Sequence, residues 1–390
     1  MKTKTVIYTS YLCSEVKYKE LYVNSAVKPG IQVQKFNRLL VEGLSLNGIN
    51  VQCLSSLPMS RIISQKIFII ERNDSVENVK FYYLPILNIP IIKDLLILVL
   101  SFFKGLFFAC KESSSFMVCD ILSMPNSLGC AIAYRLLGKK VLGIVTDLPE
   151  DVISTKIFLK LYYLVIQMCT HYVFMTKEMN LKLNKTGKPF KIIEGISDIK
   201  RVIEKQEENK FSSAKICLYA GNCNKKNGVD KLIEAILLLK HKNIILHIFG
   251  SGDEVGYIEK VAKKEKQIQY HGIQPNDEVL VYQSNSDLLI NPRPSEEEFT
   301  KYSFPSKNME YMTSGTPLLT TKLVGMPEEY YEYVYLFDDE SVEGMSKKID
   351  EVLSLSEETR KKTGLKAREF ILKEKNNVIQ TRKMIDLMKD

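Results

Sequence analysis

Short apolar runs rich in β-branched residues alternate with stretches of helical periodicity along the whole chain. In the first half, strands are expected at 5–11, 50–56, 79–87, 116–122, 139–147 and 171–176, with helices at about 31–47, 92–111, 126–138 and 153–168. This alternation predicts parallel strands with helices on both faces of the sheet. We therefore expect one doubly wound α/β unit of about 190 residues.

A second alternation follows a polar segment, IKRVIEKQEENKFSSA, which has no apolar periodicity and predicts a domain boundary near residue 198. Beyond it, strands are expected at 215–221, 244–250, 268–272, 287–292, 317–321 and 333–338, with helices at 228–240, 253–265, 275–283 and 305–314. We predict two Rossmann-like domains, 1–198 and 199–372, that face a central ligand cleft.

The segment 92–111 is unusually apolar. Residues 95–103 are all apolar except Ser101, but Lys93, Asp94 and Lys104 keep the run short of the about 20 residues that span a bilayer. Two interpretations remain: a buried crossover helix, or a helix face that rests on a lipid interface. Basic residues in the N-terminal region would suit anionic headgroups or form a solvated face: Lys17, Lys19, Lys28, Lys35 and Arg38.

The composition is that of an ordinary globular protein of two domains. The 390 residues are 45% hydrophobic and 26% charged, with 19 glycines and 13 prolines, which excludes disordered, collagenous and coiled-coil proteins. The net charge of +8 is spread too thinly to indicate nucleic acid. It favours acidic ligands or an anionic membrane surface.

No residue pattern indicates a metal site or a resident cofactor. The eight cysteines form no CxxC pair, so we expect buried thiols in a reducing compartment. The four histidines lack metal-ligand spacing, and the chain has no DxD triplet to hold a divalent cation against a diphosphate. The N-terminus MKTKTVIYTSYLC runs directly into a strand without a signal-like apolar stretch, so we expect a cytoplasmic protein.

The loop after the strand at 215–221 has the composition of an anion-binding turn. In NCNKKNG, which follows Gly221, glycine lets backbone amides approach an anion, and Lys225 and Lys226 add positive charge beside the start of a helix. The same composition also suits a plain turn, so this loop alone does not decide the function.

The stretch 291–329 is more informative. Pro305 stands where a first-turn proline belongs, so FPSK opens a helix whose free amides at Ser306 and Lys307 can face a phosphate. Glu310 follows and can accept hydrogen bonds from the paired hydroxyls of a ribose. The alternative is a glutamate that only complements the helix dipole.

This order of helix, SGTP, strand, Gly-containing loop and Glu resembles the donor-binding half of the retaining GT-B glycosyltransferases, in particular glycosyltransferase family 4 (the "group 1" transferases). YAG…NGVDKLIEA, HIFGSGD, YHGIQPNDEV and SDLLINPRP are similar to that family's successive landmarks. Over the first domain the resemblance is looser. PGIQVQKFNRLLVEGLSLNGINV looks like the family's glycine loop and first helix, which implies an acceptor side at Pro29, Gly30 and Ile31.

The resemblance implies roles for individual residues. The ribose-binding glutamate falls on Glu310, while its partner eight residues earlier falls on Tyr302 and is missing. The diphosphate-binding Arg and Lys fall on Asn222 and Asn227. Lys225, Lys226, Lys307 or Arg293 would have to neutralise the leaving group, with Lys226 and Lys307 favoured, beside the donor-loop residues Gly221 and Gly250.

The loop TDLPE resembles the family's loop near the reacting centre. Asp147 holds the place of a histidine found in many relatives, which implies a contact to the donor sugar or the acceptor; the alternative is a cap on the next helix. The last helix, 373–390, would return to the first domain.

The implied function is sugar transfer from a nucleotide-diphosphate sugar to a hydroxyl acceptor. The enzyme would be a retaining, metal-independent hexosyltransferase without a cofactor, acting on a lipid-linked saccharide or oligosaccharide in bacterial surface polysaccharide synthesis. It would contact the inner face of the cell membrane peripherally and would not bind nucleic acid.

Two other functions stay open on the same scaffold, and a third function is disfavoured. One is a nucleotide-sugar epimerase or phosphorylase. Another is a non-catalytic nucleotide-sugar-binding partner of a transferase, which the departures at Tyr302, Asn222 and Asn227 would suit. A nicotinamide dehydrogenase is disfavoured, because the nearest approach to GxGxxG is GSGDEVG, late in the chain.

Overall fold

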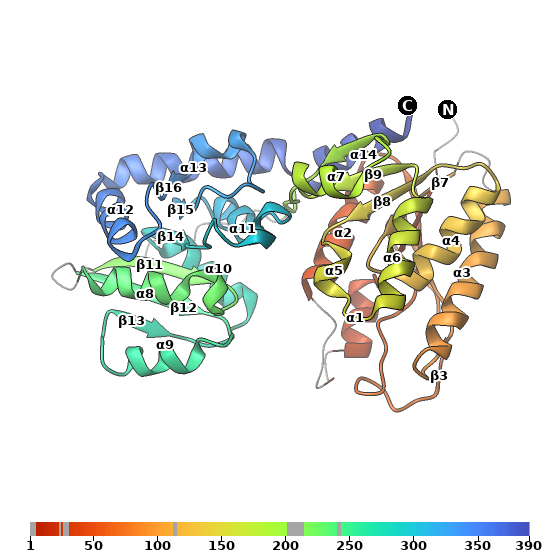
Figure 1. Cartoon of the computed structure of the whole chain (residues 1–390), viewed down its shortest axis with the longest axis horizontal. Coiled ribbons are helices and arrows are strands. Elements are labelled where there is room, and N and C mark those ends of the chain that lie inside the picture. The colour runs from red at the N-terminus through yellow and green to blue at the C-terminus, as the bar shows by residue number, and fades with distance from the viewer. Residues whose placement is uncertain are drawn as a thin grey trace. The chain divides into compact units, whose positions relative to one another are not determined.

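The computed structural model describes residues 5–22, 25, 31–111, 115–200, 214–239 and 243–389. The chain divides into two compact units, which Figure 1 shows. The first comprises Met1–Ile196 and Asn377–Asp390, and the second comprises Ser197–Asn376. These limits lie close to the expected boundaries at 198 and 372.

The first unit is built on an eight-stranded sheet with the order β10-β9-β8-β7-β1-β2-β5-β4. All neighbouring strands are parallel except the β4–β5 pair at one edge. The strands are β1 (Thr5–Ser10), β2 (Asn50–Ser55), β4 (Asp74–Val76), β5 (Val79–Tyr83), β7 (Phe116–Asp120), β8 (Val141–Val145), β9 (His171–Phe174) and β10 (Phe190–Ile192). A separate antiparallel pair is formed by β3 (Phe68–Ile69) and β6 (Ile86–Leu87).

Helices cover this sheet, and the last helix of the chain belongs to this unit. They are α1 (Glu15–Tyr22), α2 (Ile31–Leu46), α3 (Ile92–Lys111), α4 (Met124–Leu136), α5 (Pro149–Val152), α6 (Lys156–Met168), α7 (Lys177–Leu183) and α14 (Asn377–Lys389). The end of α2 and α14 are tied together by Asn47, whose Nδ2 donates to Val378 O at 2.8 Å. Gly43 allows this approach, since a Cβ there would overlap Asn377 O.

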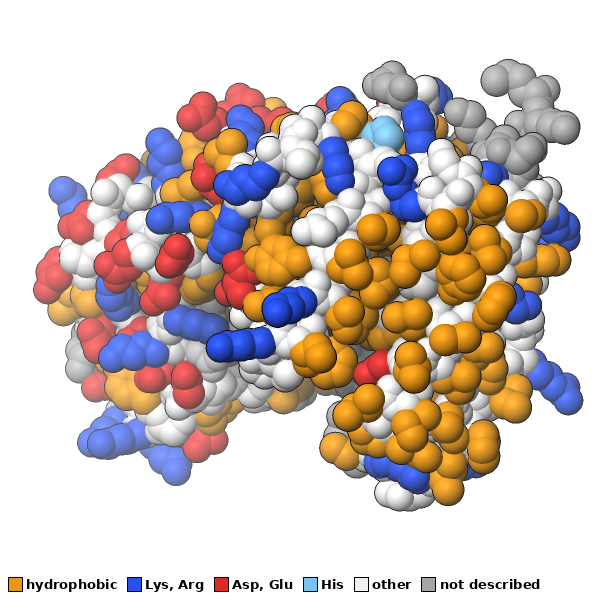
Figure 2. Space-filling model, turned by 45° about the vertical axis from the view of Figure 1, so that its right-hand side comes forward, with side chains coloured by type: hydrophobic (Ala, Val, Ile, Leu, Met, Phe, Trp, Pro, Cys, Tyr) orange, Lys and Arg blue, Asp and Glu red, His pale blue; other side chains and the backbone are white. Residues whose placement is uncertain are grey.

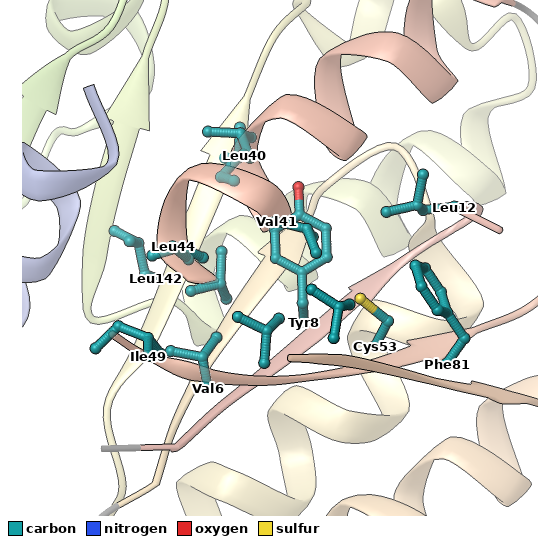
Figure 3. Close-up of a cluster of buried hydrophobic side chains, with 14 of the residues drawn as sticks. Val6, Tyr8, Leu12, Leu40, Val41, Leu44, Ile49, Cys53, Phe81 and Leu142 are labelled. Atoms are coloured by element: carbon teal, nitrogen blue, oxygen red, sulfur yellow. The ribbon is translucent and has the colours of Figure 1, made fainter. Parts of the chain in front are cut away.

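The core of the first unit lies between α2 and the sheet. Figure 3 shows Val6 and Tyr8 of β1 packed with Leu40 and Leu44 of α2. The buried Tyr8 hydroxyl donates to Asn37 Oδ1 at 2.5 Å, which connects this core to a polar network at the carboxyl end of the sheet.

Helices α3 and α4 pack through small residues. Ser101 and Gly105 lie on the buried face of α3, and a Cβ at Gly105 would come within 3.1 Å of Ala133 of α4. On α4, a Cβ at Gly129 would overlap Leu98 O. Ile97 and Phe108 are buried as well, while other large apolar residues of α3 remain exposed.

The expectation of a buried crossover helix at 92–111 is therefore wrong for one face of α3. Five large apolar side chains spaced three or four residues apart form an exposed stripe along the helix: Ile92, Leu95, Val99, Phe103 and Phe107, each between 41% and 62% exposed. We call these five residues the α3 stripe. No helix within the described residues is both long and apolar enough to cross a membrane.

The second unit contains a six-stranded, fully parallel sheet with the order β13-β12-β11-β14-β15-β16. Its strands are β11 (Lys215–Ala220), β12 (Ile244–Phe249), β13 (Ile268–Tyr270), β14 (Leu288–Asn291), β15 (Leu318–Thr320) and β16 (Tyr335–Leu336). Its α-helices are α8 (Val229–Leu237), α9 (Val255–Ala262), α10 (Asn276–Asn285), α11 (Ser306–Ser314), α12 (Val342–Ser354) and α13 (Glu357–Glu374). Separate apolar clusters on the two faces bury the sheet on both sides.

Two expectations about the first unit are corrected by the structure. The strand expected over 79–87 is two strands, β5 and β6, because Pro85 between them has no N–H to donate.

The N-terminal basic surface is smaller than expected. Lys17 is buried and bonds Glu20 at 2.9 Å and Glu71 at 3.0 Å, so it is not available to an anionic surface. Lys28 lies outside the described residues.

The cysteines form no disulfide, as expected. Seven of the eight are buried free thiols, and Cys110 is exposed.

Candidate functional site

Glycines bring three loops together at the carboxyl end of the second sheet. Gly250, after β12, has φ of 128°, and a Cβ at this position would overlap Gly221 O in the loop after β11. Gly228, before α8, has φ of 76°, and a Cβ there would overlap Pro292 O in the loop after β14. Both positions need glycine for conformation and for space. The loops that would carry a ligand in a doubly wound sheet are thus held side by side.

The loop after β11 is held by its own hydrogen bonds. Asn222 O accepts from Tyr219 Oη at 2.7 Å and from Asn227 Nδ2 at 3.0 Å. Asn227 is buried, so it supports the loop and does not present a group to solvent. The side chains of Lys225 and Lys226 are exposed. The expected positive charge of the loop is therefore accessible to a ligand.

Two cations meet over one aromatic ring in this region. Lys226 Nζ lies 5.5 Å and the Arg293 guanidinium carbon 5.3 Å from the centroid of Phe299, which belongs to the 3₁₀ turn η2 (Glu298–Lys301). Arg293 is half-buried, and its buried Nε has no hydrogen-bond partner among the described residues. Burial lowers the pKa of Arg293, yet guanidinium remains charged at neutral pH. An anion bound here would neutralise the guanidinium charge and accept a hydrogen bond from the Arg293 Nε.

The start of α11 is open to a ligand. Pro305 is its N-cap and supplies no side-chain hydrogen bond, the first turn has no acidic residue, and Ser306 is exposed. The first amides of a helix have no partner within the helix and carry its partial positive charge. The structure therefore leaves amides at Ser306 and Lys307 in the arrangement that binds phosphates in other proteins.

Glu310 is held by two donors one turn further on. Its Oε1 accepts from Lys307 Nζ at 3.1 Å and from Gln283 Nε2 of α10 at 3.0 Å. Glu310 is the fifth residue of α11, beyond the first turn where the helix dipole acts, so the dipole-complementing alternative explains it poorly. Lys307 is an ion-pair partner of Glu310 in this structure, and a diphosphate would compete for it.

Tyr302, at the position of the missing first glutamate, directly follows η2 and is half-buried. A phenol there cannot replace a carboxylate as a strong acceptor of two sugar hydroxyls.

Asp147 lies in the loop after β8 of the first unit. It does not cap the next helix, since the N-cap of α5 is Leu148 and has no side-chain cap. The capping alternative is therefore wrong. Desolvation raises the pKa of Asp147, while a hydrogen bond from Thr146 opposes the rise.

Asp120, at the end of β7, is a carboxylate that the sequence analysis missed. It is buried and accepts from the Leu122 amide at 3.0 Å, Ser123 Oγ at 3.3 Å and Asn37 Nδ2 at 3.3 Å. Burial raises its pKa to about 6, with a contribution from Asp147 nearby. The available signal was an acidic residue at the last position of an apolar strand, FMVCD.

The remaining predicted residues lie outside this description. Pro29 and Gly30 are not among the described residues, and Ile31 opens α2 with a side chain that is likewise not described. Within the described ranges, no three His, Cys, Asp or Glu side chains are grouped so that they could hold a metal ion.

Comparison with protein families gives a match over the second unit. Residues 200–370 match the family model of the glycosyl transferases group 1, which covers nearly all of this unit and less than half of the chain. A search of curated proteins found no match.

Solved structures share the fold over the whole length. Sucrose-phosphate synthase from Thermosynechococcus elongatus has a TM-score of 0.67 at 14% identity, covering 99% of this chain and 98% of that chain. A glycosyltransferase from Rickettsia africae has a TM-score of 0.65 at 14% identity, covering 100% and 98%. Anabaena HepE in complex with UDP and glucose has a TM-score of 0.63 at 12% identity, covering 99% of both chains. The predicted fold class, two Rossmann-like domains of GT-B type, is confirmed.

Proposed function

We propose that this protein is a glycosyltransferase that moves a sugar from a nucleoside-diphosphate sugar to a hydroxyl acceptor. The observation that carries the proposal is the open start of α11 followed by a fixed Glu310, within the segment that matches the group 1 transferases. HepE, which shares the fold, has been solved with UDP and glucose and with UDP-glucose, which supports a nucleotide sugar as the donor.

In the proposed complex the diphosphate is bound by protein groups. The amides of Ser306 and Lys307 would bind phosphate oxygens, Lys226 and Arg293 would supply charge, and Glu310 would accept from the ribose hydroxyls. The orphan Nε of Arg293 makes this residue as strong a candidate as Lys307, whose ammonium already pairs with Glu310. Gly221, Asn222, Lys225 and Gly250 would shape the donor loops.

We propose a transfer that retains the anomeric configuration without a metal. The acceptor oxygen forms a bond to the anomeric carbon as the bond from that carbon to the diphosphate oxygen breaks. The hydroxyl proton passes to a phosphate oxygen, and the nucleoside diphosphate leaves. Its growing negative charge would be stabilised by fixed amides and cations, which act strongly where water is excluded. Asp147 would contact the donor sugar or the acceptor.

We further propose that the acceptor is a lipid-linked saccharide and that the enzyme contacts an anionic membrane peripherally, at the inner face of a bacterial cell membrane, in surface polysaccharide synthesis. The α3 stripe supports this. Figure 2 shows hydrophobic side chains gathered on the face of the first unit that is turned to the viewer, with few charged ones among them. Lys104 and Lys111 flank Phe107, at 5.9 and 5.7 Å from its ring, where ammonium groups could reach headgroups.

A second candidate function, nucleotide-sugar binding without turnover, has one observation in its favour. Asn227 is buried as a loop support and Tyr302 offers no carboxylate, so two groups that the related transferases use are replaced here by residues without their charge.

The test is to screen UDP, GDP and a panel of nucleotide sugars for thermal stabilisation, then to incubate the stabilising donors with saccharide acceptors. A ligand bound only by the native state raises the melting temperature. Transfer to an acceptor supports the proposal. Donor binding without transfer would favour the binding partner, and a changed sugar nucleotide without any acceptor would favour an epimerase. Stabilisation by no nucleotide would overturn the donor site.

A further inference from the structure

A pocket of about 190 Å³ lies in the first unit. Its lining includes Tyr11 after β1, Asp94 of α3, Pro125 of α4, Val152 of α5, Thr155 before α6 and Tyr162 within α6. Ligands of parallel sheets bind at the carboxyl ends of the strands. Sites for drug-sized ligands measure about 300 to 1,000 Å³, so this one fits a single small ring and not a nucleotide.

Two polar groups in the pocket are without a partner. Neither the Tyr11 hydroxyl nor the Asp94 carboxylate has a hydrogen bond or ion pair with another described residue. Burial raises the pKa of Tyr11, with Tyr162 and Asp94 adding to the effect, so its phenol stays protonated and can donate. Tyr162 already donates to Leu122 O at 3.1 Å, which fixes its ring in the wall. The pocket thus offers a phenol donor and an anionic acceptor, beside the hydroxyls of Ser154 and Thr155, which also line it.

The electrostatics disfavour an anionic guest. No lysine, arginine or histidine is among the described residues that line the pocket. The starts of α4 and α6 contribute about half a positive charge each, and Pro125 at the start of α4 has no N–H to offer. Against them stand a full negative charge on Asp94 and the nearby Asp120, whose influence reaches Tyr11. The carboxylates outweigh the helix ends, and a carboxylate suits hydroxyl donors.

Exposed apolar side chains lie close in the chain to residues that line the pocket. Val152, a lining residue, is 50% exposed, and Ile157, two residues beyond the lining residue Thr155, is 66% exposed. Leu95, which follows Asp94 in the chain, is 62% exposed and belongs to the α3 stripe. The pocket and the α3 stripe thus share the start of α3, where Asp94 lines the pocket and Leu95 belongs to the stripe.

We infer that this pocket binds the uncharged, hydroxyl-bearing head of an amphipathic ligand, a single sugar ring on an apolar chain, with the chain lying against the α3 stripe. The inference rests on the proposed function, because such a ligand would be the acceptor of the transfer. It adds that the head which enters the pocket is neutral: Asp94 accepts its hydroxyls, Tyr11 donates to its oxygens, and a phosphate is excluded.

The test compares three probes on the full chain by isothermal titration calorimetry: octyl glucoside below its micelle concentration, methyl glucoside and octyl phosphate. Octyl glucoside should bind at least tenfold more tightly than either of the others. Asp94→Asn and Tyr11→Phe should each weaken the binding of octyl glucoside by about five- to tenfold, as expected for the loss of one hydrogen bond. Asp94→Asn should at the same time strengthen the binding of octyl phosphate, because it removes a negative charge from the pocket.

The matched control is Asp151→Asn, an exposed acidic residue on α5 that does not line the pocket. It should leave all three affinities unchanged. Equal or tighter binding of octyl phosphate by the wild type, no effect of Asp94→Asn, or no binding of octyl glucoside would each overturn the inference. UDP stabilisation is measured on the same variants and should not change. If UDP did not stabilise the wild-type protein, that result would count against the donor site and not against this pocket.

Discussion

At the scale of single residues, the candidate donor site depends on one carboxylate held by two neighbours. Gln283 and Lys307 both bond Glu310 Oε1, so the carboxylate is oriented before any ligand arrives. Orientation in advance reduces the ordering that binding would otherwise require. In the proposed complex, Glu310 would accept hydrogen bonds from the ribose hydroxyls, and Lys307 would pair with either Glu310 or a phosphate.

Replacing Glu310 should therefore remove activity without unfolding the protein. We expect Glu310→Ala to abolish sugar transfer while the melting temperature of the free protein changes little, and Lys307→Ala to weaken donor binding by about 1 to 3 kcal/mol. Lys301→Ala, an exposed lysine at the end of η2, is the control and should bind donor normally. Calorimetry and a transfer assay measure both effects. Undiminished transfer by Glu310→Ala would defeat the ribose assignment.

The glycine contact between two donor loops predicts a stability effect. Gly250→Ala must place a Cβ against Gly221 O at φ of 128°, so we expect a loss of at least about 2 kcal/mol in the free energy of unfolding. Gly256→Ala in α9 meets open space and should be stabilising by about 0.5 to 1 kcal/mol. Urea denaturation of both variants measures the difference. Similar stability of the two would show that the loops are not held in this contact.

The buried carboxyl of Asp120 predicts a pH dependence. Its native pKa of about 6 lies above the ordinary 3.8, so the native state binds the proton more tightly than the unfolded state. The contribution is fully present below about pH 4 and is lost as pH rises through about 6, a change of about 3 kcal/mol at most. Relative to Asp120→Asn, the wild type should lose stability between pH 4 and 7. Denaturation curves at four pH values test this, and parallel profiles for the two proteins would contradict it.

At the scale of elements, α3 differs from an ordinary surface helix because it carries large apolar residues on two faces. Its buried face includes Ile97 and Phe108 beside the small residues that permit close approach to α4, and the five residues of the α3 stripe face outward. A surface helix usually buries its apolar side. An outward apolar stripe of five side chains is costly in water unless another apolar phase covers it.

The stripe predicts binding to lipid. The double variant Phe103→Glu with Phe107→Glu should bind vesicles of phosphatidylglycerol and phosphatidylethanolamine at least tenfold more weakly than the wild type, with unchanged melting temperature, since both side chains are more than half exposed. Leu136→Glu, an exposed apolar position at the end of α4, is the control. Co-sedimentation with vesicles gives the result. Equal sedimentation of the double variant and wild type would exclude the stripe as the contact.

At the scale of the whole molecule, the sequence was sufficient where structure depends on local pattern. The alternation of apolar runs and helical periods predicted both sheets, and FPSK predicted the start of α11, because strand and helix signals are encoded within a few residues. The distant partners of Lys17 and Glu310 were not predictable, since Glu71 and Gln283 lie 54 and 27 positions away in the chain. The exposed stripe was also hidden, because only the packing of α3 on α4 decides which face is covered.

The most direct test of the central claim is a crystal structure of the full chain with UDP or GDP, whichever stabilises it. The account predicts the diphosphate at the amides of Ser306 and Lys307 and near Lys226 or Arg293, with the ribose hydroxyls on Glu310. A bound nucleotide that lies away from α11, or a ribose without contact to Glu310, would contradict it.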